Sequence, residues 1–163
     1  MTKLPQNSLK IYSLGLLMLF LTGCQTPPIN PTTSQSYLDL GLSQEGQQKY
    51  QEALASYTQA IALDSQNDQA YYRKAFVEGL DASENYLASQ EQSLKDYTKA
   101  IEINPTEPGY YLWRGLKNED ISNYQAALED FNQAEKLGLT KSDLLIISRN
   151  RVKKTLNDLA TAP

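Results

Sequence analysis

Small and aromatic residues recur at fixed spacings along the middle of the chain. Residues 50–64 place Ala53, Tyr57 and Ala60 four and three residues apart. The same spacing returns twice, at Ser93, Tyr97 and Ala100 and at Ala127, Phe131 and Ala134. Residues at these separations lie on one face of an α-helix. The small residues let another helix approach closely while the ring fills the space between the backbones, so each stretch predicts a helix packed against a neighbouring helix.

A second pattern of aromatic and small residues precedes each of these predicted helices. It is carried by Tyr37, Leu40 and Gly41, by Tyr71 and Ala75, and by Tyr111 and Gly115. Together with Tyr50, Tyr124 and Pro105, this order resembles the tetratricopeptide repeat, a helix–turn–helix unit of about 34 residues. The resemblance covers residues 35–139. The second copy follows the first by forty residues, and the excess in residues 81–88 predicts a longer turn or an extra half-turn of helix.

The fold that these repeats predict is all-α. It is a short right-handed α-solenoid of about three helix–turn–helix repeats followed by a capping helix. The repeats occupy residues 37–140 and span about 34–67, 68–107 and 108–140. Pairs of helices stack because one pair cannot bury both of its faces, and about three pairs are needed for a stable array.

Residues 141–160 are predicted to form the capping helix, which covers the apolar face of the last pair. The segment carries one apolar stripe, made of Leu145, Ser148, Val152, Leu156 and Leu159. Thr140, with Asp143 three residues later, is the predicted N-cap of this helix.

The amino-terminal residues have the features of a secretory signal peptide. Lys3 and Lys10 are followed by an apolar run, residues 11–21, that is short for a membrane span. The run ends in Leu-Thr-Gly-Cys at residues 21–24, which resembles the lipobox of bacterial lipoproteins. The resemblance implies a signal peptide at residues 1–23 and a diacylglyceryl group on the Cys24 thiol. A chance cysteine behind an ordinary signal peptide is the alternative.

Residues 24–36 begin with the lipidated cysteine and are rich in Pro, Thr and Ser, so they predict a semi-extended tether. Gln25 follows the cysteine, which in enterobacterial-type sorting resembles export to the outer membrane. The expected location is therefore the cell envelope. The protein would be lipid-anchored to a bacterial membrane, with the outer membrane favoured and the domain in the periplasm.

Composition narrows the possible functions. The 163 residues include no histidine and one cysteine, which excludes intrachain disulfides, His or Cys zinc sites and His-dependent triads. No phosphate loop or nucleophile motif is present, so we expect no enzyme, cofactor, metal or small-molecule substrate. Residues 34–140 carry eight basic and seventeen acidic side chains, which argues against nucleic-acid binding. Residues 141–163 carry a net +3, which predicts a solvated face or a site for anionic lipids or an acidic partner.

In tetratricopeptide proteins the first helix of each pair lines a concave groove that grips peptide segments. Carried over by position, the resemblance implies a groove lined by Leu38, Asp39 and Leu42, by Tyr72, Arg73 and Phe76, and by Leu112, Trp113 and Leu116. Chaperone-type members clamp a peptide's terminal carboxylate with Lys and Asn, but this chain has Leu, Tyr and Leu where the first clamp lysine would sit. Trp113 is turned about 200° from Tyr111 and is predicted to face the groove.

An apolar, aromatic groove suits an amphipathic helix or an apolar strip of a partner protein. The alternative is that part of this lining packs against neighbouring helices or the linker. The predicted function is a membrane-anchored scaffold or adaptor for other, unidentified proteins in the bacterial envelope. Two alternatives remain open: a pilotin-like assembly factor for a membrane machine, and a self-associating structural envelope lipoprotein.

Overall fold

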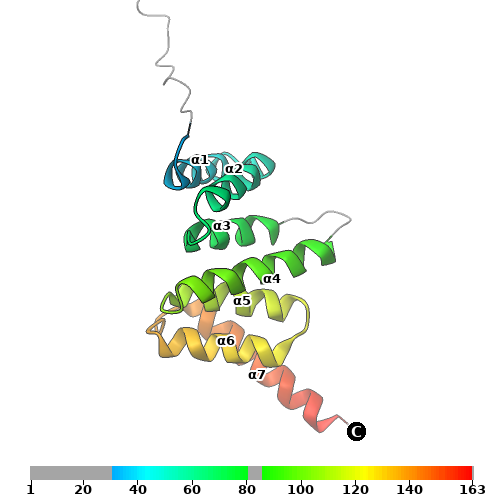
Figure 1. Cartoon of the computed structure of the whole chain (residues 1–163). Helices are drawn as coiled ribbons and strands as arrows, with labels where there is room; N and C mark the ends of the chain where they lie inside the picture. The colour runs from blue at the N-terminus through cyan, green and yellow to red at the C-terminus, as the bar shows by residue number, and fades with distance from the viewer. Residues whose placement is uncertain (1–30, 81–85, 163) are drawn as a thin grey trace, which may run out of the picture. The chain divides into compact units, whose positions relative to one another are not determined.

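A computed structural model describes residues 31–80 and 86–162 of the chain, except for the side chains of residues 86–88. These residues belong to one compact unit, Pro31–Pro163. The predicted signal peptide, the lipobox with Cys24 and most of the linker lie outside the described residues. Within the described part the chain forms α-helices and no strands (Figure 1). The helices are α1 (Ser34–Gly46), α2 (Tyr50–Leu63), α3 (Asp68–Glu78), α4 (Tyr86–Ile103), α5 (Pro108–Asp120), α6 (Tyr124–Lys136) and α7 (Asp143–Thr161).

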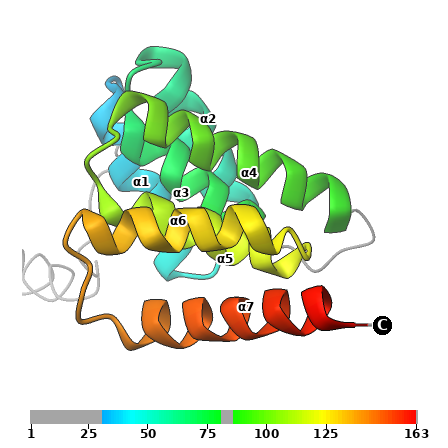
Figure 2. The same cartoon turned by 90° about the horizontal axis from the view of Figure 1, so that it is seen from below.

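The helices of the described part pack in chain order. Each helix contacts the next one along the chain, with the most extensive packing inside the pairs α1–α2, α3–α4 and α5–α6. Figure 2 shows α7 lying alongside the last pair, and α7 contacts both α6 and α5. The all-α repeat architecture predicted from the sequence is confirmed. Among the described residues, no helix combines the length and hydrophobicity that a bilayer crossing requires.

The small residues and rings of the repeat pattern form the core between paired helices. Tyr57, Tyr97 and Phe131 are fully buried, as are the alanines three residues after them. A Cβ atom at Gly41 would lie 2.4 Å from the Tyr57 ring, and one at Gly115 would lie 2.7 Å from the Phe131 ring. Both distances are shorter than van der Waals contact, so only glycine lets the Tyr57 and Phe131 rings approach α1 and α5 this closely.

Local signals explain where several helices begin. The Thr33 side chain accepts a hydrogen bond from the Ser36 N–H in a capping box, and Asn67 accepts one from the Ala70 N–H. The N-cap of α7 is Ser142, whose hydroxyl accepts from the Leu145 N–H. The prediction that Thr140 caps this helix is therefore wrong. Both residues have a suitable hydroxyl, and the path of the chain leaving α6 determines which one meets the free N–H groups.

The excess residues of the second repeat are partly helical. Helix α4 has 18 residues, whereas its counterparts α2 and α6 have 14 and 13. Part of the excess therefore extends the amino-terminal end of α4, and residues 81–85 lie outside the described part.

Helix α7 covers the last pair with part of its predicted stripe. Leu145, Ser148 and Val152 are buried, and Leu156 packs against the same core cluster as Phe131. Leu159 is 60% exposed, so the inclusion of this residue in the buried stripe is wrong. Helical period places it on the inward side, but burial also needs a neighbouring helix at that height.

Candidate protein-binding groove

The first helices of the three pairs, α1, α3 and α5, carry the residues predicted to line the groove. Two of these residues do not line it. Leu38 is 2% exposed and Leu112 is 7% exposed, and both belong to the hydrophobic core. Each lies three residues before the small residue of its helix, Gly41 or Gly115, and so shares the core-facing side. Their prediction as groove residues is corrected accordingly.

The apolar part of the remaining surface centres on two aromatic side chains. Phe76 of α3 and Trp113 of α5 contact each other edge to face, with ring centroids 4.9 Å apart and planes at 86°. Both side chains are half-buried. Leu116 is also half-buried, and it lies three residues after Trp113 on the same side of α5. This contact joins the first helices of successive repeats and leaves part of an aromatic surface accessible.

Part of the lining also packs against the helices, as the alternative interpretation proposed. Leu42 and Phe76 pack against the first core cluster, and Leu116 packs against the last one. Asp39 is exposed, and its carboxylate accepts a hydrogen bond from Gln35. The predicted groove lining therefore has half-buried apolar side chains, and Asp39 adds an exposed acidic group on α1.

Tyr72 and Arg73 provide the polar part of the site. The Tyr72 ring lies against Tyr97 and Tyr110, with centroid distances of 5.9 and 5.0 Å. Burial raises the pKa of the Tyr72 hydroxyl, and the nearby Arg73 guanidinium opposes this shift. Arg73 lies 5.4 Å from the Tyr72 ring centroid and 3.5 Å from the Glu45 carboxylate. A cavity of about 190 Å³ adjoins these two residues, lined also by Gln69, Glu107, Gly109 and Tyr110.

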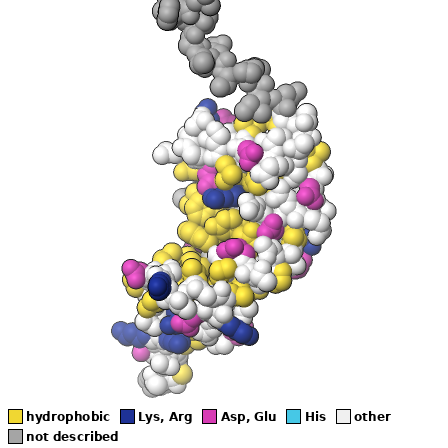
Figure 3. Space-filling model, turned by 90° about the vertical axis from the view of Figure 1, so that its left-hand side faces the viewer, with side chains coloured by type: hydrophobic (Ala, Val, Ile, Leu, Met, Phe, Trp, Pro, Cys, Tyr) yellow, Lys and Arg dark blue, Asp and Glu magenta, His cyan; other side chains and the backbone are white. Residues whose placement is uncertain are grey.

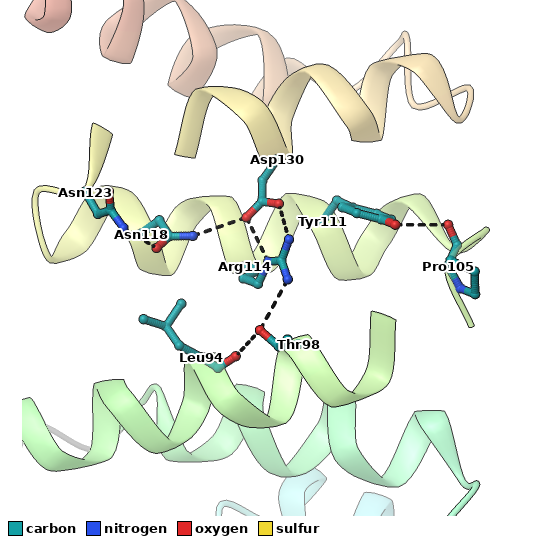
Figure 4. A network of polar contacts seen from close by, with 8 residues as sticks. All are labelled: Leu94, Thr98, Pro105, Tyr111, Arg114, Asn118, Asn123 and Asp130. Atoms are coloured by element: carbon teal, nitrogen blue, oxygen red, sulfur yellow. Dashed lines mark hydrogen bonds and ion pairs between the residues drawn. The ribbon is translucent and has the colours of Figure 1, made fainter. Parts of the chain in front are cut away.

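Sequence reasoning missed a set of polar contacts that join the helices. Figure 4 shows the one in the third repeat, where the Arg114 guanidinium donates to both carboxylate oxygens of Asp130 at 3.0 and 2.6 Å. Arg114 also donates to the Thr98 hydroxyl of α4, and Asn118 donates to Asp130. In the sequence, the residue before each small residue of the first helix is Leu40, Lys74 or Arg114, but nothing local marks the partner of this residue on the next helix.

Charge is unevenly distributed over the described surface. Figure 3 shows hydrophobic side chains along the middle of one face, with Lys and Arg gathered toward the end that α7 forms. Part of this positive charge is paired internally, since Arg149 forms an ion pair with Glu135 and Arg151 forms one with Glu119. In the described part of the chain, no group of three or more potential metal ligands occurs.

Comparisons with known proteins agree with this architecture. A family model for the tetratricopeptide repeat matches residues 34–67. The chain is 31% identical over 120 residues to the Hsp70-Hsp90 organizing protein 1 of Glycine max, and the match covers 68% of this chain and 20% of that protein. The chain thus spans about a fifth of the length of this curated relative.

Solved structures share the fold. The Arabidopsis OM64 TPR domain is 26% identical, with a TM-score of 0.66, covering 74% of this chain and 94% of that domain. The second TPR domain of human RPAP3, solved in complex with the HSP70 peptide SGPTIEEVD, is 22% identical, with a TM-score of 0.64 and the same coverage. The chain therefore contains tetratricopeptide repeats, as its pattern predicted, and this repeat class indicates a protein-interaction scaffold.

Proposed function

We propose that this chain is a membrane-anchored scaffold that binds an apolar strip of another protein in the groove formed by α1, α3 and α5. The observation that carries the proposal is the half-buried, edge-to-face pair of Phe76 and Trp113. Tryptophan is among the residues most enriched in the central anchors of protein interfaces. A partner that covered this pair would complete the burial of both rings.

The chemistry of the groove favours an apolar segment over a terminal carboxylate. The second TPR domain of human RPAP3 is solved in complex with an HSP70 peptide. The present chain has Leu38, Tyr72 and Leu112 where chaperone-type members place the first clamp lysine, and both leucines are buried in the core. An amphipathic helix can place apolar side chains against Phe76 and Trp113 and keep its charged face in water.

The proposed location is a bacterial envelope membrane, with the outer membrane favoured and the domain in the periplasm. The support is the sequence of residues 1–24, in which a basic flank and an apolar run lead to the Leu-Thr-Gly-Cys motif. A diacylglyceryl group with a further acyl chain at Cys24 would hold the protein stably on the membrane. An assembly factor for a membrane machine is the nearest variant of this function.

One observation favours a second candidate, a self-associating envelope protein. Leu144 and Ile147 of α7 are 45% and 60% exposed and lie three residues apart on one side of the helix, so they form a small exposed apolar patch. Sedimentation velocity at several concentrations separates the candidates. A monomer at all concentrations supports the adaptor, and a concentration-dependent oligomer supports self-association.

The groove is tested by placing a photo-crosslinking amino acid at Trp113 of the full chain in cells, with Leu63 as the matched position. Leu63 is an exposed apolar residue of α2 and lies outside the predicted lining. We expect a discrete adduct from position 113 and none from position 63. Against the partner so identified, Trp113→Ala should weaken binding about thirtyfold, since losing an aromatic anchor commonly costs about 2 kcal/mol. Unchanged affinity would remove the groove from the proposal.

The anchor has a separate test. Cys24→Ser should abolish incorporation of a palmitate analogue in cells, because the thiol is the acyl acceptor of the motif. Equal labelling of the variant would contradict the lipoprotein assignment and leave the groove experiment unaffected.

A further inference from the structure

Three positions between the two helices of each pair differ in polarity and charge from one repeat to the next. They are Leu40, Gln44 and Ser56 in the first repeat, Lys74, Glu78 and Asp96 in the second, and Arg114, Asn118 and Asp130 in the third. In the first repeat the Ser56 hydroxyl donates to the Gln44 side chain at 2.6 Å. In the third the Asn118 amide donates to Asp130 at 3.2 Å. The middle position is thus a neutral amide in both outer repeats.

The second repeat places a carboxyl group at this middle position. Lys74 donates to Glu78 Oε1 at 2.7 Å and to Asp96 Oδ2 at 2.5 Å. The three side chains are 16%, 14% and 9% exposed, in the order Lys74, Glu78 and Asp96. The second carboxyl oxygen of Glu78 is buried and has no hydrogen-bond partner. One ammonium group therefore faces two carboxyl groups in a poorly solvated space.

Such an arrangement favours the binding of one proton. Burial penalises the charged carboxylate, and a neighbouring carboxylate adds to this penalty. Burial raises the pKa of the Glu78 carboxyl to about 7, with Lys74 opposing the shift and Asp96 adding to it.

The structure describes the other titratable groups of the packed helices. In α4, Glu91 and Lys95 are exposed, and the Tyr97 hydroxyl is buried without a hydrogen-bond partner. In α5, Lys117 donates to the Gly79 carbonyl at 3.1 Å and to Asp120 at 2.9 Å. In α1, Glu45 accepts from the Tyr57 hydroxyl and pairs with Arg73. The acidic residue of α2, Glu52, is exposed.

We propose that Lys74, Glu78 and Asp96 form a proton-binding site between α3 and α4, in which protonated Glu78 takes the place of the neutral amides Gln44 and Asn118. A protonated carboxyl group has a donor and an acceptor, as an amide has. When the proton leaves to solvent, two carboxylates share one ammonium group and their repulsion weakens the contact between α3 and α4. Glu78 is the last residue of α3, so the change occurs at the carboxy-terminal end of this helix.

The direction of the pH effect follows from the raised pKa. Because the folded-state value lies above the ordinary value of 4.5, the contribution of Glu78 to stability is fully present below about pH 4.5. It is lost as the pH rises through about 7. From pH 5.5 to 8 this one group raises the unfolding equilibrium constant by about thirtyfold. The chain has no histidine, the side chain that ordinarily titrates between pH 5.5 and 8. A change in stability over this pH range can therefore be assigned to Glu78 more easily.

Urea unfolding of the full chain at pH 5.5, 7 and 8 tests the site. We expect the urea midpoint of the wild type to fall across this range and that of Glu78→Gln to stay nearly constant. Glu102→Gln is the matched control, since Glu102 is exposed and pairs with Lys99, and it should behave as the wild type. The same pH dependence in Glu78→Gln and the wild type would overturn the proposal.

A second measurement does not depend on the variant folding. In wild-type protein with carbon-13 at the glutamate carboxyl groups, one NMR signal should titrate with a midpoint near 7. If every glutamate signal titrates between about 4 and 5, near the ordinary value for glutamate, the site does not bind a proton as proposed.

Discussion

Three aromatic rings occupy the same place in the three repeats, and only one of their hydroxyl groups is paired. The Tyr57 hydroxyl donates to Glu45 Oε2 at 2.6 Å. The Tyr97 hydroxyl is buried without a hydrogen-bond partner, and Phe131 has no hydroxyl at all. The change from Tyr to Phe is therefore predicted to have different effects in the first and second repeats, although both rings are fully buried.

The magnitudes follow from these contacts. A hydrogen bond to a charged group contributes about 1.5–3 kcal/mol, so Tyr57→Phe should lower the free energy of unfolding by about 2 kcal/mol. Tyr97→Phe breaks no hydrogen bond and removes a buried unsatisfied group, so stability should stay the same or rise by about 1 kcal/mol. Burial, together with the Glu45 hydrogen bond, raises the pKa of Tyr57, whereas burial is the main cause of the raised pKa of Tyr97.

Urea unfolding of the full chain at pH 7, followed by circular dichroism, measures both variants against the wild type. The slope of free energy against urea should remain unchanged, because neither change alters the surface exposed on unfolding. A double-mutant cycle with Glu45→Gln should assign most of the Tyr57→Phe effect to this one pair. If Tyr97→Phe is as destabilising as Tyr57→Phe, the difference between the two hydroxyl environments is refuted.

Three further changes test the packing of the repeats and the backbone conformation of a turn between helices. Gly115→Ala should lower the free energy of unfolding by about 1–3 kcal/mol, because the added methyl group overlaps the Phe131 ring. A urea midpoint at least as high as that of the wild type would contradict this close contact. A stop after Gly138 removes α7 and should abolish cooperative unfolding. A stop after Asn157 removes the exposed residues 158–162 together with Pro163 and should leave cooperative unfolding intact. Gln48 has a φ of 60°, so Gln48→Gly should raise the thermal midpoint by relieving about 1 kcal/mol of strain, and a lower midpoint would show that its side chain is needed.

The pairing of helices was predictable from the sequence because its signals are local. Ala53, Tyr57 and Ala60 lie within eight residues, and helical geometry alone places them on one face. The same pattern in three copies predicted the repeat class and the all-α fold. It also predicted an aromatic surface at Phe76 and Trp113, which the structure brings into contact.

The polar contacts between helices were not predictable in this way. Lys74 meets Asp96, and Arg114 meets Asp130, across 22 and 16 residues of chain. Which charged residues become neighbours depends on how two helices cross, and the sequence pattern contains no direct information on that angle. The unusual environment of Glu78 is a consequence of this crossing, so its role became visible only once α3 and α4 were placed together.

Sequence by itself determined that this chain folds into stacked helix pairs, since the spacing of small and aromatic residues leaves few other ways to bury them. Tertiary structure decided which side of each first helix stays accessible. Leu38 and Leu112 had the positions of groove residues, yet both are buried, while Trp113 remains half-exposed. The physical reason is that Leu38 and Leu112 lie on the core-facing side of their helices, whereas the part of Trp113 that stays exposed depends on how closely the neighbouring helices approach it.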